Sequence, residues 1–158
     1  MSVNNDKLLL FAVAHEIYGV SINKVRQVMQ YEAITAVRSQ LDYVKGVINL
    51  RGKIVPIIDM RLKFGMEEVE YTDRTIFIIF DIEGEHNILN LGIVVDKVLD
   101  VIDTNEEELE KTPDVGLKVK NQFLYGIAKH NDSMIMVLNI DKILTADEII
   151  NLDSVKKE

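Results

Sequence analysis

Histidine, the side chain most often used for acid–base or metal chemistry near neutral pH, occurs three times in this sequence. His15, His86 and His130 lie far apart, and none forms the H-x-x-x-H or H-E-x-x-H spacing of a zinc site. No G-x-S-x-G elbow and no G-x-x-x-x-G-K-[ST] phosphate loop is present. The sequence therefore predicts strand-end or turn histidines, with no catalytic group, no bound metal and no cofactor.

An acidic run, Glu106, Glu107, Glu108 and Glu110, is the other feature that could bind an ion. Its spacing lacks the pattern of an EF-hand loop. Thr104 and Glu107 have the spacing of a capping box, and acidic side chains favour the positive end of a helix. We therefore interpret the run as a solvated helix start.

Composition narrows the function further. The 158 residues carry a formal net charge of -8, which argues against binding to nucleic acid or to anionic lipid. The chain has no cysteine, which excludes thiol catalysis and disulfides. Neither an apolar run long enough to insert into a membrane nor a signal peptide is apparent, so we expect a cytoplasmic protein.

Short runs rich in Val, Ile and Leu recur, separated by glycine or polar turns. Arg51-Gly52, Glu83-Gly84 and Asn131-Asp132 each separate two such runs, as hairpin turns do. This pattern predicts a mainly β barrel or sandwich. The expected strands cover residues 7–14, 17–21, 33–37, 44–50, 53–59, 75–81, 88–95, 98–102, 123–129 and 134–139.

Helices are expected to be few and short. The apolar residues of segment 22–29 fall on one helical face. Asp59 is placed to cap a turn over residues 60–64, which Gly65 would end. A capping-box pattern that starts at Thr145 predicts a C-terminal helix.

The sequence also repeats itself in two blocks. Residues 19–28 align with residues 92–101 and keep Gly, Lys and two Val in place. Residues 46–59 align in the same way with residues 126–139. Because both blocks recur in the same order, we interpret them as a duplicated β module.

The duplication predicts how the chain is organised. We expect a single domain over residues 1–158, with halves at roughly 15–70 and 71–152 and an N-terminal strand that could join either half. Each half is small for a core of its own, so packing the halves together would bury more apolar surface. This predicts an apolar seam with a groove along its edge, and a protein that acts through surfaces.

One segment carries a family resemblance. Residues 44–64, which include Asn-Leu-Arg-Gly and Pro-Ile-Ile-Asp-Met, resemble the G-x-x-N-L-R-G-x-x-x-P-x-x-D-L signature of the CheW domain family, with Met60 at its last position. Residues 18–25 are similar to the Y-G-[IV]-x-I-x-x-V motif of that family, and residues 92–96 to its G-[IV]-V-V-D motif. The likeness runs from about Leu8 to Leu152, nearly the whole chain.

The resemblance implies two SH3-like, five-stranded barrel halves around a shared apolar core. It implies a non-enzymatic adaptor, located at chemoreceptor arrays, that couples transmembrane chemoreceptors to the histidine kinase CheA in chemotaxis signalling. The partners would be the regulatory domain of the kinase, met barrel end to barrel end, and the cytoplasmic helical tip of the receptors, held in the groove. Exposed partner surfaces would also permit weak self-association.

The resemblance assigns a partner-binding role to Arg51, whose planar guanidinium suits carboxylates and helix-end carbonyls. We expect Gly52 and Gly46 to serve the backbone, at a positive-φ turn and at a close approach respectively, so losing either would disturb binding by reshaping the turn. A solvated turn residue is the alternative for Arg51.

The resemblance also places Val25 and Val28 on the receptor-facing groove, whereas their pattern alone fits a core position equally well. Val98, which matches Val25 in the repeat, is the candidate for the opposite wall. Gln27 departs from the family, where glutamate is frequent, so no charge-based contact is carried over at that position.

Two other functions stay open at this stage. A CheW-type scaffold of a non-motility chemosensory pathway would share every feature above. A small-ligand-binding β-barrel is disfavoured by the lack of paired catalytic groups, and strong thermal stabilisation by a metabolite would favour it.

Overall fold

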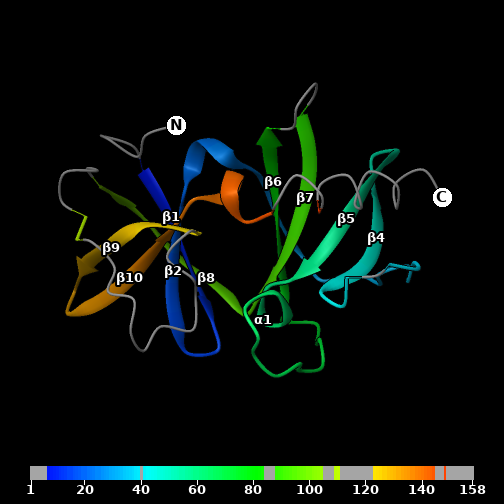
Figure 1. Cartoon of the computed structure of the whole chain (residues 1–158), viewed down its shortest axis with the longest axis horizontal. Coiled ribbons are helices and arrows are strands. Elements are labelled where there is room, and N and C mark those ends of the chain that lie inside the picture. The colour runs from blue at the N-terminus through cyan, green and yellow to red at the C-terminus, as the bar shows by residue number, and fades with distance from the viewer. Residues whose placement is uncertain are drawn as a thin grey trace.

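The computed structural model describes residues 7–39, 41–83, 88–104, 109–110, 123–144 and 148. Within this part, the strands form two five-stranded sheets that lie side by side in Figure 1. The strands are β1 (Lys7–Val13), β2 (Glu16–Ser21), β3 (Val25–Gln30), β4 (Val44–Leu50), β5 (Lys53–Asp59), β6 (Ile76–Glu83), β7 (Ile88–Val95), β8 (Lys97–Asp103), β9 (Leu124–His130) and β10 (Ser133–Leu138). Three short helices are η1 (Ile22–Lys24), α1 (Met60–Lys63) and η4 (Ile140–Lys142), and no helix of the described part is long and apolar enough to cross a membrane.

The two sheets have the same topology. Sheet I has the order β8-β1-β2-β10-β9, and sheet II has the order β3-β6-β7-β5-β4. Each contains one parallel pair, β2 with β10 and β5 with β7. Gly19 lies opposite Val137 in the first pair, and Gly92 lies opposite Ile57 in the second. These are matching positions of the sequence repeat, so the duplication is present in the structure.

The sheets divide the chain differently from the expected halves at 15–70 and 71–152. Sheet II is continuous from Val25 to Val95, whereas sheet I combines β1 and β2 with β8, β9 and β10. The N-terminal strand β1 belongs to sheet I, where it pairs with both β2 and β8. The chain therefore passes from sheet I to sheet II at η1 and returns between β7 and β8.

A single apolar cluster joins the two sheets, as the sequence predicted. Leu9 and Phe11 of sheet I and Ile78, Phe80 and Leu91 of sheet II are all buried in it. An aromatic row crosses the seam, with ring-centroid distances of 5.7 Å from Phe11 to Tyr18, 6.2 Å from Tyr18 to Phe64 and 5.7 Å from Phe64 to Phe123. Hydrophobic burial of this kind is the main force that holds the sheets together.

Three hairpins close through two-residue turns with positive φ at both positions, as type I′ turns require. The turns at Arg51-Gly52 and Asn131-Asp132 were predicted, and a third lies at Ala14-His15. His15 is thus a turn residue, and His130 is the last residue of β9. His86 and the expected turn at Glu83-Gly84 lie in or border residues 84–87, outside the described residues.

Two predicted elements are wrong. Segment 22–29 is helical only over η1, and β3 follows at once because its backbone pairs with β6. Segment 33–37 is not a strand, and a single bridge joins Thr35 to Val47 of β4. The capping role of Asp59 is confirmed. Most of the expected helices after Thr104 and Thr145 lies outside the described residues.

Candidate partner-binding surfaces

The tip of the β4–β5 hairpin carries Arg51 and Gly52. Their φ angles are 54° and 85°. The side-chain oxygen Oδ1 of Asn49 accepts a hydrogen bond from the Gly52 N–H at 2.9 Å, which fixes the turn from within the hairpin. Both tip residues are exposed, and within the described part of the chain Arg51 forms no ion pair. The turn therefore presents the Arg51 guanidinium to solvent at the end of a two-stranded support.

Gly46 lies away from the tip, at the point where the segment after β3 crosses β4. A Cβ on Gly46, whose φ is 148°, would overlap the carbonyl oxygen of Thr35. Thr35 and Val47 exchange two backbone hydrogen bonds of 2.9 Å beside it. Gly126 repeats this arrangement in sheet I, where a Cβ would lie 2.7 Å from the Glu110 oxygen. The predicted close approach at Gly46 is thus present, and it closes the sheet on itself.

The structure separates the apolar residues expected along the groove. Val25 of β3 lies opposite Phe80, and Val98 of β8 lies opposite Phe11. Both valines are half-buried and pack against the cluster shared by the two sheets. Val28 instead faces outward with 42% of its surface exposed. Val25 and Val98 therefore flank the seam from two edge strands, whereas Val28 lies on another face of β3.

Sequence reasoning missed the outward face of β8. Val101 is 44% exposed and Leu99 is 40% exposed on this edge strand. Val101 matches Val28 in the repeat, and the two residues have nearly the same exposure. Their alignment in the sequence was the signal that the two valines occupy equivalent positions, although it does not show that these positions are exposed. Each sheet thus ends in an edge strand with an inward valine and an outward valine.

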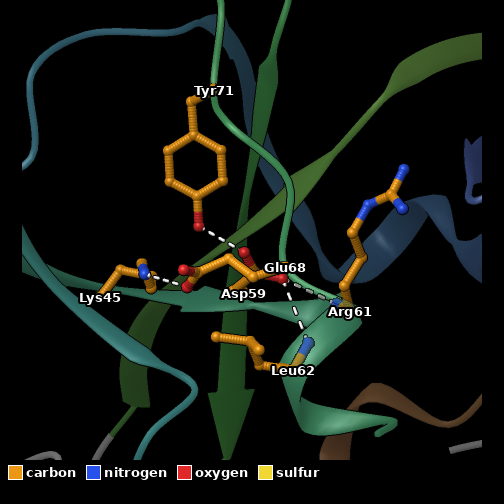
Figure 2. A network of polar contacts seen from close by, with 6 residues as sticks. All are labelled: Lys45, Asp59, Arg61, Leu62, Glu68 and Tyr71. Carbon is orange, nitrogen blue, oxygen red and sulfur yellow. Dashed lines mark hydrogen bonds and ion pairs between the residues drawn. The ribbon is translucent and has the colours of Figure 1, made fainter. Parts of the chain in front are cut away.

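A polar network anchors the loop after α1, as Figure 2 shows. The carboxylate of Asp59 is 1% exposed, and its Oδ1 accepts hydrogen bonds from the backbone N–H groups of Arg61 at 2.8 Å and Leu62 at 3.3 Å. Its Oδ2 accepts a bond of 2.5 Å from the Tyr71 hydroxyl. Lys45 and Glu68 form an ion pair of 2.5 Å nearby.

The chemistry of this network is structural. Burial of Tyr71, followed by its hydrogen bond to Asp59, raises the pKa of its hydroxyl above the usual value. Both oxygens of Asp59 accept hydrogen bonds, one from the backbone of α1 and the other from Tyr71, so the carboxylate holds the loop after α1 in place. The adjoining pocket, lined by Arg61, Tyr71 and Arg74 among others, holds about 170 Å³. That volume is small beside the roughly 300–1,000 Å³ usual for ligand pockets.

Comparisons with known proteins agree with this architecture. The family model described as CheW-like domain matches residues 7–148. The chemotaxis protein CheW of Klebsiella aerogenes is 34% identical over 96% of this chain and 89% of that protein. The CheW of Treponema pallidum is 28% identical over 96% of this chain and 91% of its own length.

A solved structure has the same fold over nearly its full length. The scaffolding protein TtCheW from Thermoanaerobacter tengcongensis superposes with a TM-score of 0.80 at 32% sequence identity. The match covers 95% of this chain and 94% of that one. The two sheets and their connections are therefore those of a known scaffold fold.

Proposed function

This chain belongs to the CheW-like domain family of chemotaxis scaffold proteins, and we propose that it acts without catalysis of its own. The role of the family is to couple chemoreceptors to the histidine kinase CheA. The support is a likeness that spans nearly the whole chain, together with surfaces suited to protein partners. We place its action in the cytoplasm, at chemoreceptor arrays.

The kinase contact is proposed for the β4–β5 tip. The single observation that carries it is Arg51, held in solvent on a type I′ turn inside the Asn-Leu-Arg-Gly motif. A guanidinium in this setting suits a carboxylate or the carbonyls at a helix end. Gly52 supports the contact by keeping the turn, and Gly46 supports it indirectly by keeping β4 in place.

The receptor contact is proposed for the surface beside the seam, where Val25 and Val98 lie. Val25 and Val98 each pack at the edge of the shared cluster, on strands whose outer edges have no partner strand among the described residues. An amphipathic helix from a receptor tip would place its apolar ridge against such valines. Val28 and Val101, which are equivalent in the repeat, lie on the outward faces of β3 and β8. They would therefore contact a different part of the partners.

The kinase contact is tested by calorimetric titration of the isolated CheA regulatory domain into the wild-type chain, Arg51→Ala and Arg74→Ala. Arg74 is an exposed arginine on the loop before β6, so its removal costs the same charge. We expect Arg51→Ala to weaken binding about tenfold or more, the usual range for an arginine at an interface centre. Equal affinities for all three folded proteins would refute the assignment of Arg51.

A further inference from the structure

We infer that two polar clamps fix the angle between the sheets and thereby position Val25 and Val98, the valines of the proposed receptor surface. One clamp is built on Arg61 and Asp96, and the other on Lys24 and Asp141. The inference rests on the proposed function, because it assigns these residues a positioning role in partner binding.

The first clamp ties α1, which lies between β5 and β6 of sheet II, to the β1–β2 hairpin of sheet I. Arg61 of α1 donates to Oδ2 of Asp96 at 2.7 Å, and its side chain is only 18% exposed. The same carboxylate oxygen accepts the N–H of Ala14, in the β1–β2 turn, at 2.9 Å. The backbone N–H of Asp96 also donates to the Ala12 carbonyl at 2.9 Å. Asp96 lies where the chain returns to sheet I, so this clamp holds that crossing.

The second clamp ties η4, which follows β10 of sheet I, to η1 and to the end of β6 in sheet II. Lys24, at the end of η1, pairs with Asp141 of η4 at 2.9 Å, with side-chain exposures of 12% and 23%. Oδ1 of Asp141 accepts the N–H of Glu83, at the end of β6 in sheet II, at 3.3 Å. Burial lowers the pKa of Lys24, but its bonds to Asp141 outweigh this and raise it overall, so the ammonium stays charged. This clamp holds the crossing from sheet I to sheet II.

The clamps occupy matching places in the duplicated fold although their residues differ. Arg61 and Asp141 are equivalent in the repeat, in the helices that follow β5 and β10. The cation is on the helix in one clamp, and the carboxylate is on the helix in the other. In both clamps the carboxylate also accepts a backbone N–H near the end of a strand: that of Ala14, just after β1, in the first clamp, and that of Glu83, at the end of β6, in the second.

Their position links the clamps to the two valines. Val25 follows Lys24 directly, and Val98 comes two residues after Asp96. The hydrophobic effect that holds the sheets together is non-directional, whereas charged hydrogen bonds require a defined geometry. The clamps are therefore the features that select one angle, and Lys24 and Asp96 act directly before β3 and β8, the strands of the two valines.

The inference is tested with the double variant Lys24→Gln/Arg61→Gln. Two properties are measured: affinity for a receptor cytoplasmic fragment, and the distance between spin labels at Lys53→Cys in β5 and Met134→Cys in β10. Labelling is specific because the chain has no other cysteine. Two controls accompany it: Lys24→Arg/Arg61→Lys, which keeps both charges, and Lys7→Gln, which breaks a Lys7–Asp103 pair of 2.9 Å within sheet I.

We expect the double glutamine variant, folded by circular dichroism, to broaden or shift the label distance and to weaken receptor binding about five- to tenfold, the lower range of coupling between sites. Both controls should match the wild type. An unchanged distance and affinity, with only a lower unfolding midpoint, would show that the pairs are merely structural and overturn the inference. If the wild-type chain binds no receptor fragment, the proposed function fails instead, and an altered label distance still supports the clamps.

Discussion

At the scale of the residue, backbone conformation and hydrogen bonding explain why particular side chains stand where they do. Arg51 keeps a left-handed φ of 54° because the turn needs one, and its side chain is thereby directed to solvent. Gly46 is required because the neighbouring carbonyl of Thr35 occupies the place of a side chain. These two residues are close in sequence, yet one serves recognition in our proposal and the other serves closure of the sheet.

Replacing Gly46 by alanine is expected to lower the free energy of unfolding by about 2–4 kcal/mol, because backbone strain and overlap with Thr35 add. The matched control is Gly65→Ala, where φ is 77° and no atom lies near the added Cβ. There we expect a loss of only about 1 kcal/mol, from φ alone. Urea unfolding measures both values, and similar losses in the two variants would contradict the close approach at Gly46.

The raised pKa of Tyr71 predicts a dependence of stability on alkaline pH. The folded state holds this proton more tightly, because burial and the bond to Asp59 disfavour the phenolate. Its contribution is therefore complete below about pH 10, the pKa of an unfolded tyrosine, and is lost as the pH rises further. Tyr18, buried and bonded to Glu16, acts in the same direction.

We expect the unfolding free energy of the wild type to fall above about pH 10, and that of Tyr71→Phe to fall less steeply. Below that pH the variant should be less stable by about 1 kcal/mol, from the lost hydrogen bond. Urea titrations from pH 7 to pH 11 give the slopes. If the variant and the wild type lose stability in parallel above pH 10, the link between Tyr71 and Asp59 is wrong.

At the scale of the element, local patterns identified most strands but not their faces. Alternation and turn residues sufficed for β4, β5 and β7, whose predicted and observed bounds coincide. His15 was expected at a strand end or turn, but Ala14 was expected in the strand, because alanine is not a usual left-handed residue; the pairing of β1 with β2 imposes that conformation. Local reasoning fails where a distant strand decides the conformation.

The segment after η1 shows the same limit. Val25 and Val28 have helical spacing, but the pairing of β3 with β6 makes them strand residues. A bulge between Val25 and Gln27 then sets which side chains point toward the seam. Of the candidate site, the Arg51 tip was readable from Asn-Leu-Arg-Gly. The sequence did not predict that Val25 and Val28 face different sides, nor did it predict the clamps. Both features depend on contacts between segments that are remote in the sequence.

Because Val25 faces the shared cluster and Val28 faces outward, replacing each by alanine should lower the free energy of unfolding by different amounts. Val25→Ala should lower the free energy of unfolding by about 1 kcal/mol, because it removes half-buried methyl groups from the shared cluster. Val28→Ala, at an outward position, should change it by less than about 0.5 kcal/mol. Chemical denaturation gives both numbers, and a larger cost for Val28 would mean that β3 presents the opposite face to the seam.

At the scale of the whole molecule, the order of the strands makes the two sheets dependent on each other. Sheet II is one continuous stretch of chain inserted between β2 and β8, so sheet I is complete only when its flanking pieces meet. The largest apolar cluster includes side chains of both sheets. An adaptor that must present two surfaces in a fixed relation gains from this arrangement, because neither surface moves without disturbing a common core.

The shared cluster predicts a single cooperative transition. The slowest-exchanging backbone amides of β1 in sheet I and β6 in sheet II should report the same free energy of opening, because exposing either strand breaks the common core. Native-state hydrogen exchange followed by NMR measures this for each amide. Amides of sheet I that exchange through a separate opening of lower free energy would show two independent units.

The central claim, that the chain joins receptor to kinase, is tested most directly by sedimentation of vesicles that carry a chemoreceptor. The vesicles are mixed with CheA in the presence of the wild-type chain, of Arg51→Ala, or of neither. We predict that CheA sediments with the vesicles when the wild-type chain is present and that much less does so with Arg51→Ala. CheA that remains in the supernatant at saturating concentrations of the folded wild-type chain would contradict the account.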